Sequence, residues 1–143
     1  MRQLEFFEMM ICRKIMNLFE MIGNKHTWDD ITFCKAWLKS EVLDRTISYD
    51  QTLFCQSVLY YYNDVMAEFG KDLKETGNEM YFPALGWFGY TTTYWMYRDN
   101  VKPEIFDNYD IKYILQDYPV LHTYSTKHAI DEIRENYFIK AKP

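Results

Sequence analysis

The segment Leu121-His122-Thr123 has the residue types best suited to acid-base chemistry. It follows Pro119, precedes the last amphipathic stretch, and is flanked by Tyr118 and Tyr124. An imidazole changes charge near neutral pH, so His122 could act as an acid or a base in a cleft between these rings. In the structural alternative, Thr123 or Ser125 caps the next helix and His122 hydrogen-bonds to the backbone. We favour the structural interpretation, because the spacing fixes no nucleophile or carboxylate beside His122.

Other reaction motifs are absent from the sequence. There is no G-x-S-x-G stretch, and Gly86-Trp87-Phe88-Gly89 lacks the further glycines and the Lys-Ser or Lys-Thr pair of a phosphate-binding loop. The three histidines do not form H-E-x-x-H, and His128 with Glu132 is only an i,i+4 pair. We therefore expect no catalytic residue, no metal site and no cofactor.

The three cysteines indicate a reducing compartment. Cys12, Cys34 and Cys55 are odd in number and form no C-x-x-C pair, which disfavours disulfides and zinc. Cys12 and Cys55 lie in apolar helical patterns, where a reduced cysteine acts as a small hydrophobe. We expect a cytoplasmic protein.

A stripe of aromatic residues is the main positive feature of the sequence. Aromatic residues make up 19% of the chain, which is more than a core of this size needs, so some rings should be exposed. A stripe at helical spacing more often faces a core, but exposed members could stack on a nucleobase or pack against another protein. The stripe consists of Trp87, Tyr90, Tyr94 and Tyr97, with Arg98 at its end. These residues, together with His122 and Tyr124, are the candidate partner-binding residues.

Composition excludes several classes of protein. The 143 residues are 48% apolar and 26% charged, the balance of a single globular domain. A net charge of -5 disfavours direct nucleic-acid binding. The longest apolar run, from Phe82 to Tyr97, is too short and too rich in Thr and Tyr to span a bilayer. Glu5 and Glu8 interrupt the first apolar stretch, so it does not resemble a signal peptide.

Hydrophobic periodicity predicts helices in the first half of the chain. Apolar residues between 4 and 22 recur at spacings of three and four, and this helix should stop at Gly23-Asn24. Thr27 should cap a second helix that bends or restarts near Ser40. Ser48 should open a long third helix that continues to about Phe69.

The second half should contain the central helix. Pro83 suits a first turn, and Gly86, Gly89 and Thr93 share one side, where another helix could approach closely. We expect this helix to close at residues 98–100. A short helix should start at residues 102–104, another, capped by Asp110, should end before Pro119, and the last should begin near Ser125 or Thr126. No strand pattern occurs, so we predict an all-α, single-domain bundle of five to seven helices with a central aromatic-rich helix. The domain should span residues 1–143, with N-terminal helices in residues 1–77 and the aromatic helix and the Leu-His-Thr motif in residues 78–143.

The C-terminal third resembles a family of short bacterial proteins of unknown function. Members of that family carry a small helical motif ending in Y-x-x-L-H-T and an acidic last helix, and their genes often lie beside those of ADP-ribosyltransferase-like toxins, in toxin-antitoxin-like cassettes. The resemblance implies a small partner-binding protein and assigns no catalytic residue. It rests on Glu104-Ile105-Phe106, Tyr109, Ile111, Tyr113-Ile114, Tyr118, Leu121-His122-Thr123 and Ile130-Asp131-Glu132-Ile133, and more loosely on Leu85-Gly86-Trp87, Tyr90 and Tyr94-Trp95.

Three functional hypotheses follow. The first is a non-catalytic, antitoxin-like protein that binds and restrains a partner protein, such as a toxin or a defence protein, with homo-oligomers also possible. The second is a phage-encoded inhibitor of a bacterial defence system, either anti-CRISPR-like or a sponge for a nucleotide signal. The third is an enzyme that uses His122 with Asp117 or Asp131. We favour the first, because aromatic residues are abundant and reaction motifs are absent.

Overall fold

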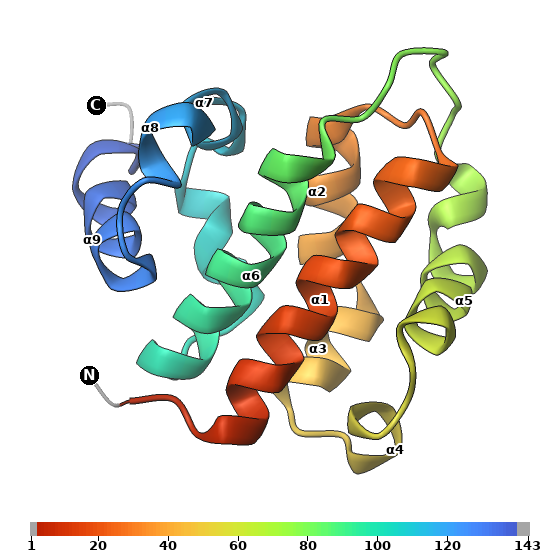
Figure 1. Ribbon diagram of the computed structural model, residues 1–143, viewed down its shortest axis with the longest axis horizontal. Coiled ribbons are helices and arrows are strands. Elements are labelled where there is room, and N and C mark those ends of the chain that lie inside the picture. The colour runs from red at the N-terminus through yellow and green to blue at the C-terminus, as the bar shows by residue number, and fades with distance from the viewer. Residues whose placement is uncertain (1–2, 140–143) are drawn as a thin grey trace.

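Two long antiparallel helices, α1 (Phe6–Lys25) and α6 (Phe82–Asp99), form the centre of the fold. They lie side by side in the computed structural model, which describes residues 3–139 (Figure 1), and pack more extensively than any other pair of helices. Gly89 allows this approach, because a Cβ atom there would lie 3.2 Å from Ile15 Cγ2 and from Phe19 Cγ. The close approach expected at the glycines of this helix is confirmed.

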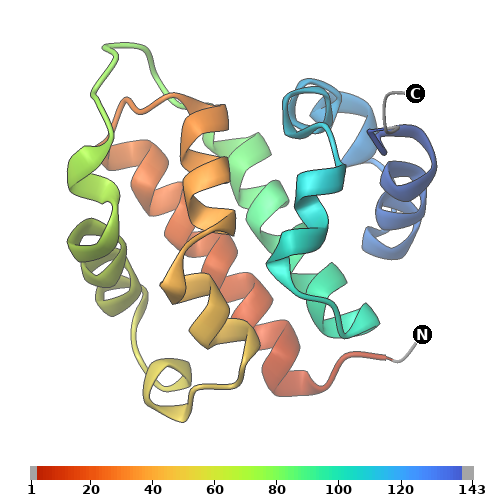
Figure 2. The same cartoon turned by 180° about the vertical axis from the view of Figure 1, so that it is seen from behind.

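The first half of the chain wraps around the back and one side of this pair. α2 (Asp30–Leu38) and α3 (Glu41–Ile47) lie behind it, and α5 (Val58–Glu68) packs on the far side of α1 (Figure 2). The single turns α4 (Gln51–Phe54) and η1 (Gly70–Asp72) flank α5. The core between these layers is aromatic, with Phe19 meeting Phe33 and Trp37 edge-on at ring-centroid distances of 4.8 and 5.4 Å.

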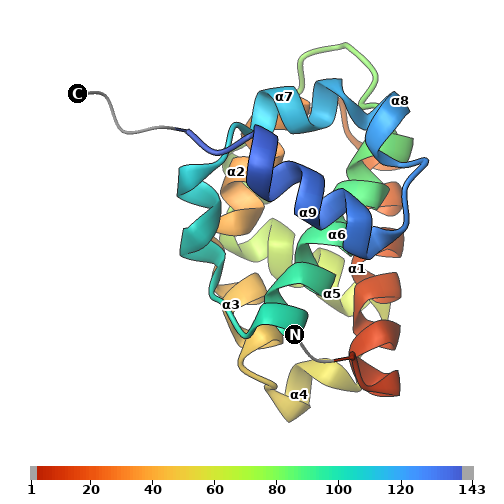
Figure 3. The ribbon, with the colours of Figure 1, turned by 90° about the vertical axis from the view of Figure 1, so that its left-hand side faces the viewer.

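The second half covers the other side of α6. A 3-10 helix, η2 (Pro103–Asn108), leads to α7 (Ile111–Gln116) and α8 (Tyr118–Leu121), and α9 (Thr126–Asn136) crosses α6 (Figure 3). Residues 3–139 contain no strand, only an isolated antiparallel bridge between Tyr109 and Phe138. The protein is therefore an all-α single compact domain, with six helices of seven residues or more in the part described.

Local capping signals account for several helix starts. Asp110 and Ser125 each accept a backbone N–H of the helix that follows, as predicted, and Ser40, where a bend or restart was expected, caps α3 in the same way. The expected cap at Thr27 is wrong, because Asp29 caps α2 through the N–H of Thr32. The first helix also runs to Lys25, past the expected stop at Gly23-Asn24.

The long helix expected from Ser48 to Phe69 is broken in two. α4 ends at Phe54, and Ser57 caps a new helix, α5. A contact from another part of the chain stabilises the break: Lys14 Nζ donates to the carbonyl oxygens of Phe54 at 2.9 Å and Gln56 at 2.8 Å. These carbonyls lie at the end of α4, so the ammonium group satisfies acceptors that a continuing helix would have used.

Of the two cysteines expected in apolar surroundings, Cys12 is buried as predicted and Cys55 is not. Cys12 and Cys34 are buried, whereas Cys55 is exposed at the C-terminal end of α4. Burial raises the pKa of the Cys12 thiol, so it stays protonated and packs as an apolar group. Across residues 3–139, no helix is both long enough and apolar enough to cross a membrane.

Candidate functional site

Four aromatic rings connect the start of α6 to α8. The Tyr118 ring lies edge-on to Trp87 at 5.7 Å and to Tyr81 at 5.9 Å, and it stacks on His122 at 4.4 Å between ring centroids. Tyr81 and His122 are exposed, and Trp87 and Tyr118 are half-buried. We call Tyr81, Trp87, Tyr118 and His122 the ring cluster.

Helix α8 is too short to be stable alone, so its neighbours position its rings. Pro119 occupies the first turn, where a missing N–H does no harm, and Leu121 is its one fully buried side chain. Asp117 lies just before α8, and its carbonyl oxygen accepts a hydrogen bond from the N–H of Leu121. Its carboxylate accepts a hydrogen bond from the Tyr137 hydroxyl at 2.5 Å. The preceding turn thereby ties α8 to the end of α9.

His122 has the contacts that the structural interpretation predicts. Its Nδ1 donates to the Tyr118 carbonyl oxygen at 2.8 Å, and the Thr123 hydroxyl donates to the Val120 carbonyl oxygen at 2.6 Å. Within residues 3–139, no carboxylate hydrogen-bonds to the His122 ring. Its contacts therefore fix the turn before α9.

The other candidate residues fall into pairs. Tyr90 and Tyr94 are half-buried on α6 with ring centroids 6.3 Å apart. Tyr124 is half-buried and stacks on exposed His128 at 4.3 Å. These residues remain accessible on the surface, with the ring cluster, as candidates for partner binding.

Tyr97 and Arg98 are not on the surface, which corrects their place among the candidate residues. Tyr97 is 2% exposed, and its hydroxyl donates to the Thr46 carbonyl oxygen at 2.9 Å. The Arg98 side chain is fully buried and pairs with Asp99. Helical spacing places both on the aromatic stripe, but residues from α3 and α9 cover the C-terminal end of that stripe.

A chain of polar groups around His26 was not predicted. His26 Nδ1 lies 3.0 Å from Glu75 Oε2, and Nε2 lies 2.7 Å from the Tyr62 hydroxyl oxygen. The tautomer that donates from Nδ1 accepts the Tyr62 proton at Nε2. Glu75 also accepts the Thr27 N–H, which is the main reason that the pKa of its carboxyl is lowered. The partners lie 36 to 49 residues apart, so no local motif signals the contact.

This arrangement fastens the connection between η1 and α6 to the connection between α1 and α2. The His26 ring also stacks on Trp28 at 4.0 Å, and Thr76 donates its hydroxyl to the Thr27 carbonyl oxygen at 2.6 Å. We call His26, Glu75 and Tyr62 the polar clip. Each of its groups has a hydrogen-bonding partner in the fold, so the clip explains how a long connection is held.

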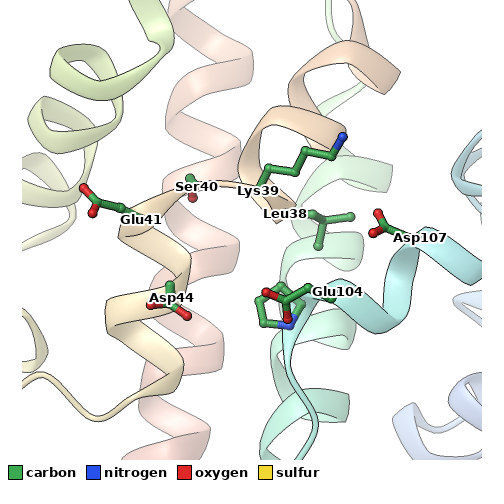
Figure 4. A pocket seen from close by; sticks show the side chains of 8 residues that line it. Leu38, Lys39, Ser40, Glu41, Asp44, Glu104 and Asp107 are labelled. Carbon is green, nitrogen blue, oxygen red and sulfur yellow. The ribbon is translucent and has the colours of Figure 1, made fainter.

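A cleft of about 380 Å³ between the α2–α3 junction and η2 is rich in acidic residues. It contains Glu41, Asp44, Glu104 and Asp107, and Figure 4 shows the Glu41 carboxylate pointing away from the two carboxylates of η2. Glu41 precedes Val42, and the N–H groups of both bind Glu68. Among the described residues, no group of three His, Cys, Asp or Glu side chains is placed to hold a metal ion.

Comparison with known proteins does not extend these observations. No model of a protein family matches the chain, and no curated protein or solved structure gives a significant match. The similarity of residues 104–133 to the bacterial family with the Y-x-x-L-H-T motif therefore remains a hypothesis.

Proposed function

We propose that the protein is a non-catalytic helical protein that binds and restrains a partner protein, in the manner of an antitoxin. The observation that carries this proposal is the ring cluster. Two exposed apolar side chains adjoin it in the chain, Phe82, which is 43% exposed, and Val120, which is 57% exposed. Aromatic rings with a polar edge, beside accessible apolar groups, are enriched where proteins meet.

The contacts within the ring cluster favour binding in a second way. Tyr118 contacts both Trp87 and His122, and the preceding turn is anchored by the hydrogen bond from Tyr137 to Asp117. Rings already held in place lose little conformational freedom when a partner covers them. The surface is therefore ordered before binding.

The net charge of the chain indicates what kind of partner would fit. It is -5, and α9, which follows the ring cluster in the chain, has three acidic residues, Asp131, Glu132 and Glu135, against two basic residues, Lys127 and Arg134. Complementary charge raises association rates and disfavours partners of like charge. We therefore propose a partner with a basic surface.

Co-expression with the products of neighbouring genes tests the proposal. We expect one of these proteins to copurify with the chain and to lose its own activity in the complex. Val120→Glu should weaken the complex about tenfold or more, because it places a charge within the apolar contact. Leu59→Glu on α5 is the matched control, because Leu59 is 54% exposed and lies outside the ring cluster.

Two results would overturn the proposal. One is a chain that stays monomeric with every neighbouring gene product. The other is a complex that Val120→Glu and Leu59→Glu weaken equally, because binding would then not depend on the ring cluster.

A further inference from the structure

The first turns of α1 expose a cluster of large apolar side chains. Phe6 is 79% exposed, and Phe7, Met9 and Met10 are 43 to 55% exposed. Residues three and four positions apart are neighbours on a helix, so Met9 and Met10 lie beside Phe6. Single exposed hydrophobic residues are common, but four within two turns of one helix mark a surface that binds something. We call Phe6, Phe7, Met9 and Met10 the apolar patch.

The apolar patch lies at the opposite end of the central helix pair from the ring cluster. α1 and α6 are antiparallel, and a Cβ atom at Gly23, near the end of α1, would lie 2.7 Å from Phe82 Cβ at the start of α6. α2 and α3 lie behind the pair, so none of the described helices crosses in front of α1 (Figure 1). The patch is therefore open to a partner that leaves the ring cluster uncovered.

The area of the patch suits an interface of ordinary size. The four side chains together expose on the order of 400 Å² of apolar surface. A stable interface buries about 800 Å² on each partner, and somewhat more than half of that area is apolar. Burial raises the pKa of Tyr90 on α6, whereas the nearby charge of Arg13 lowers it, so this half-buried ring borders the same face.

Two opposite charges lie on either side of the apolar patch. Glu5 and Arg13 are exposed, and neither forms an ion pair within residues 3–139. The Glu5 N–H donates to the carboxylate of buried Glu8 at 2.9 Å, which holds the first turn in place. Glu5 and Arg13 are each four residues from Met9. A two-fold axis through Met9 of two antiparallel α1 helices therefore places Glu5 of each copy beside Arg13 of the other.

We infer that this face of α1 binds a second copy of the chain in a symmetric dimer. The Met9 side chains of the two copies meet at the axis, Phe6 of each copy packs on α1 of the other, and two Glu5–Arg13 pairs close the edges. The inference goes beyond the proposed function, because it concerns another surface and another partner. Dimerisation is measured on the chain alone, so it can fail without affecting the test of the ring cluster.

Sedimentation equilibrium of the purified chain tests the inference. Between about 1 and about 500 µM, the mean mass should rise from 17.4 kDa toward twice that value, with a micromolar dissociation constant or tighter. Met9→Lys should weaken the dimer about tenfold or more, because two like charges would meet at the axis. Met21→Lys, the same change at a half-buried position near the end of α1, is the matched control and should leave the dissociation constant unchanged.

Charge reversal tests the arrangement of the two helices. Glu5→Lys and Arg13→Glu should each weaken the dimer about five- to tenfold, because like charges would then face one another at both edges. An equimolar mixture of these two variants should recover the affinity of the parent chain, because a mixed dimer again pairs opposite charges at both edges. Circular dichroism of each variant confirms that the helices are retained.

Four results would overturn the inference. The first is a mass of 17.4 kDa throughout the concentration range. The second is equal weakening by Met9→Lys and Met21→Lys, and the third is a mixture of the charge variants that associates no better than either variant alone. The fourth is a monomeric chain that sediments with phosphatidylcholine vesicles unless Met9→Lys is present, because the apolar patch would then bind a lipid surface.

Discussion

Gly89 on α6 provides a sharp test of how the two central helices pack. A methyl group at this position would lie 3.2 Å from Ile15 Cγ2 and from Phe19 Cγ. Both neighbouring side chains are fully buried, so they have little room to move. Alanine stabilises a helix interior by about 1 kcal/mol relative to glycine, whereas overpacking a filled core costs about 1 to 3 kcal/mol. We therefore expect Gly89→Ala to lower the free energy of unfolding by about 1 kcal/mol.

Gly86, one turn earlier on the same helix, is the matched control. A methyl group there would lie 3.3 Å from Met16 Cγ and from Glu20 Cγ. Both of these side chains are flexible and only half-buried, so they can move aside. The gain in helix propensity should therefore remain, and Gly86→Ala should raise the free energy of unfolding by about 0.5 to 1 kcal/mol.

Urea unfolding followed by circular dichroism measures both changes. The two variants should differ by about 1.5 to 2 kcal/mol in the free energy of unfolding, with opposite signs relative to the parent protein. If Gly89→Ala were as stabilising as Gly86→Ala, the contact between α1 and α6 would be looser than the distances indicate. Gly89→Leu adds a larger probe, and an unchanged stability for that variant would refute the packing argument outright.

Three further outcomes follow from single contacts. Glu75→Gln should lower stability by about 1 kcal/mol at neutral pH and speed proteolysis between η1 and α6. The Thr27 N–H lowers the pKa of Glu75, so the stabilisation by the Glu75 carboxylate is fully present above the ordinary carboxyl pKa and is lost as the pH falls through the pKa of Glu75 in the folded protein. A stability difference between Glu75→Gln and the parent protein that persisted in acid would contradict this origin. Tyr137→Phe should lower the melting temperature by removing the hydrogen bond to Asp117, and an unchanged melting curve would show that α8 is held by other contacts. Lys14→Met should cost about 2 kcal/mol in urea unfolding by leaving two carbonyls at the end of α4 without their charged donor, whereas an effect below about 0.5 kcal/mol would mean that solvent replaces it.

Local signals in the sequence predicted much of the helical framework. Ser40, Asp110 and Ser125 cap helices at the expected places, because a cap depends on a side chain and an N–H group two or three residues away. The side of α6 with small residues was also predicted, because Gly86 and Gly89 are three residues apart and therefore lie on the same face of a helix. Both features are properties of neighbouring residues.

Contacts between distant segments decided the candidate sites. The sequence identified Trp87 and His122, but only the fold brings both into contact with Tyr118 and adds Tyr81. The periodic stripe could not show that its C-terminal end is covered, because periodicity describes one helix and not its neighbours. Tyr97 is buried for that reason.

The all-α fold class and the helix caps were therefore determined by the sequence itself, through interactions between residues a few positions apart. The break after α4, the polar clip and the burial of Arg98 were decided by the tertiary structure. Each depends on groups that lie far apart along the chain and meet only when the helices pack, and no local pattern encodes such a meeting.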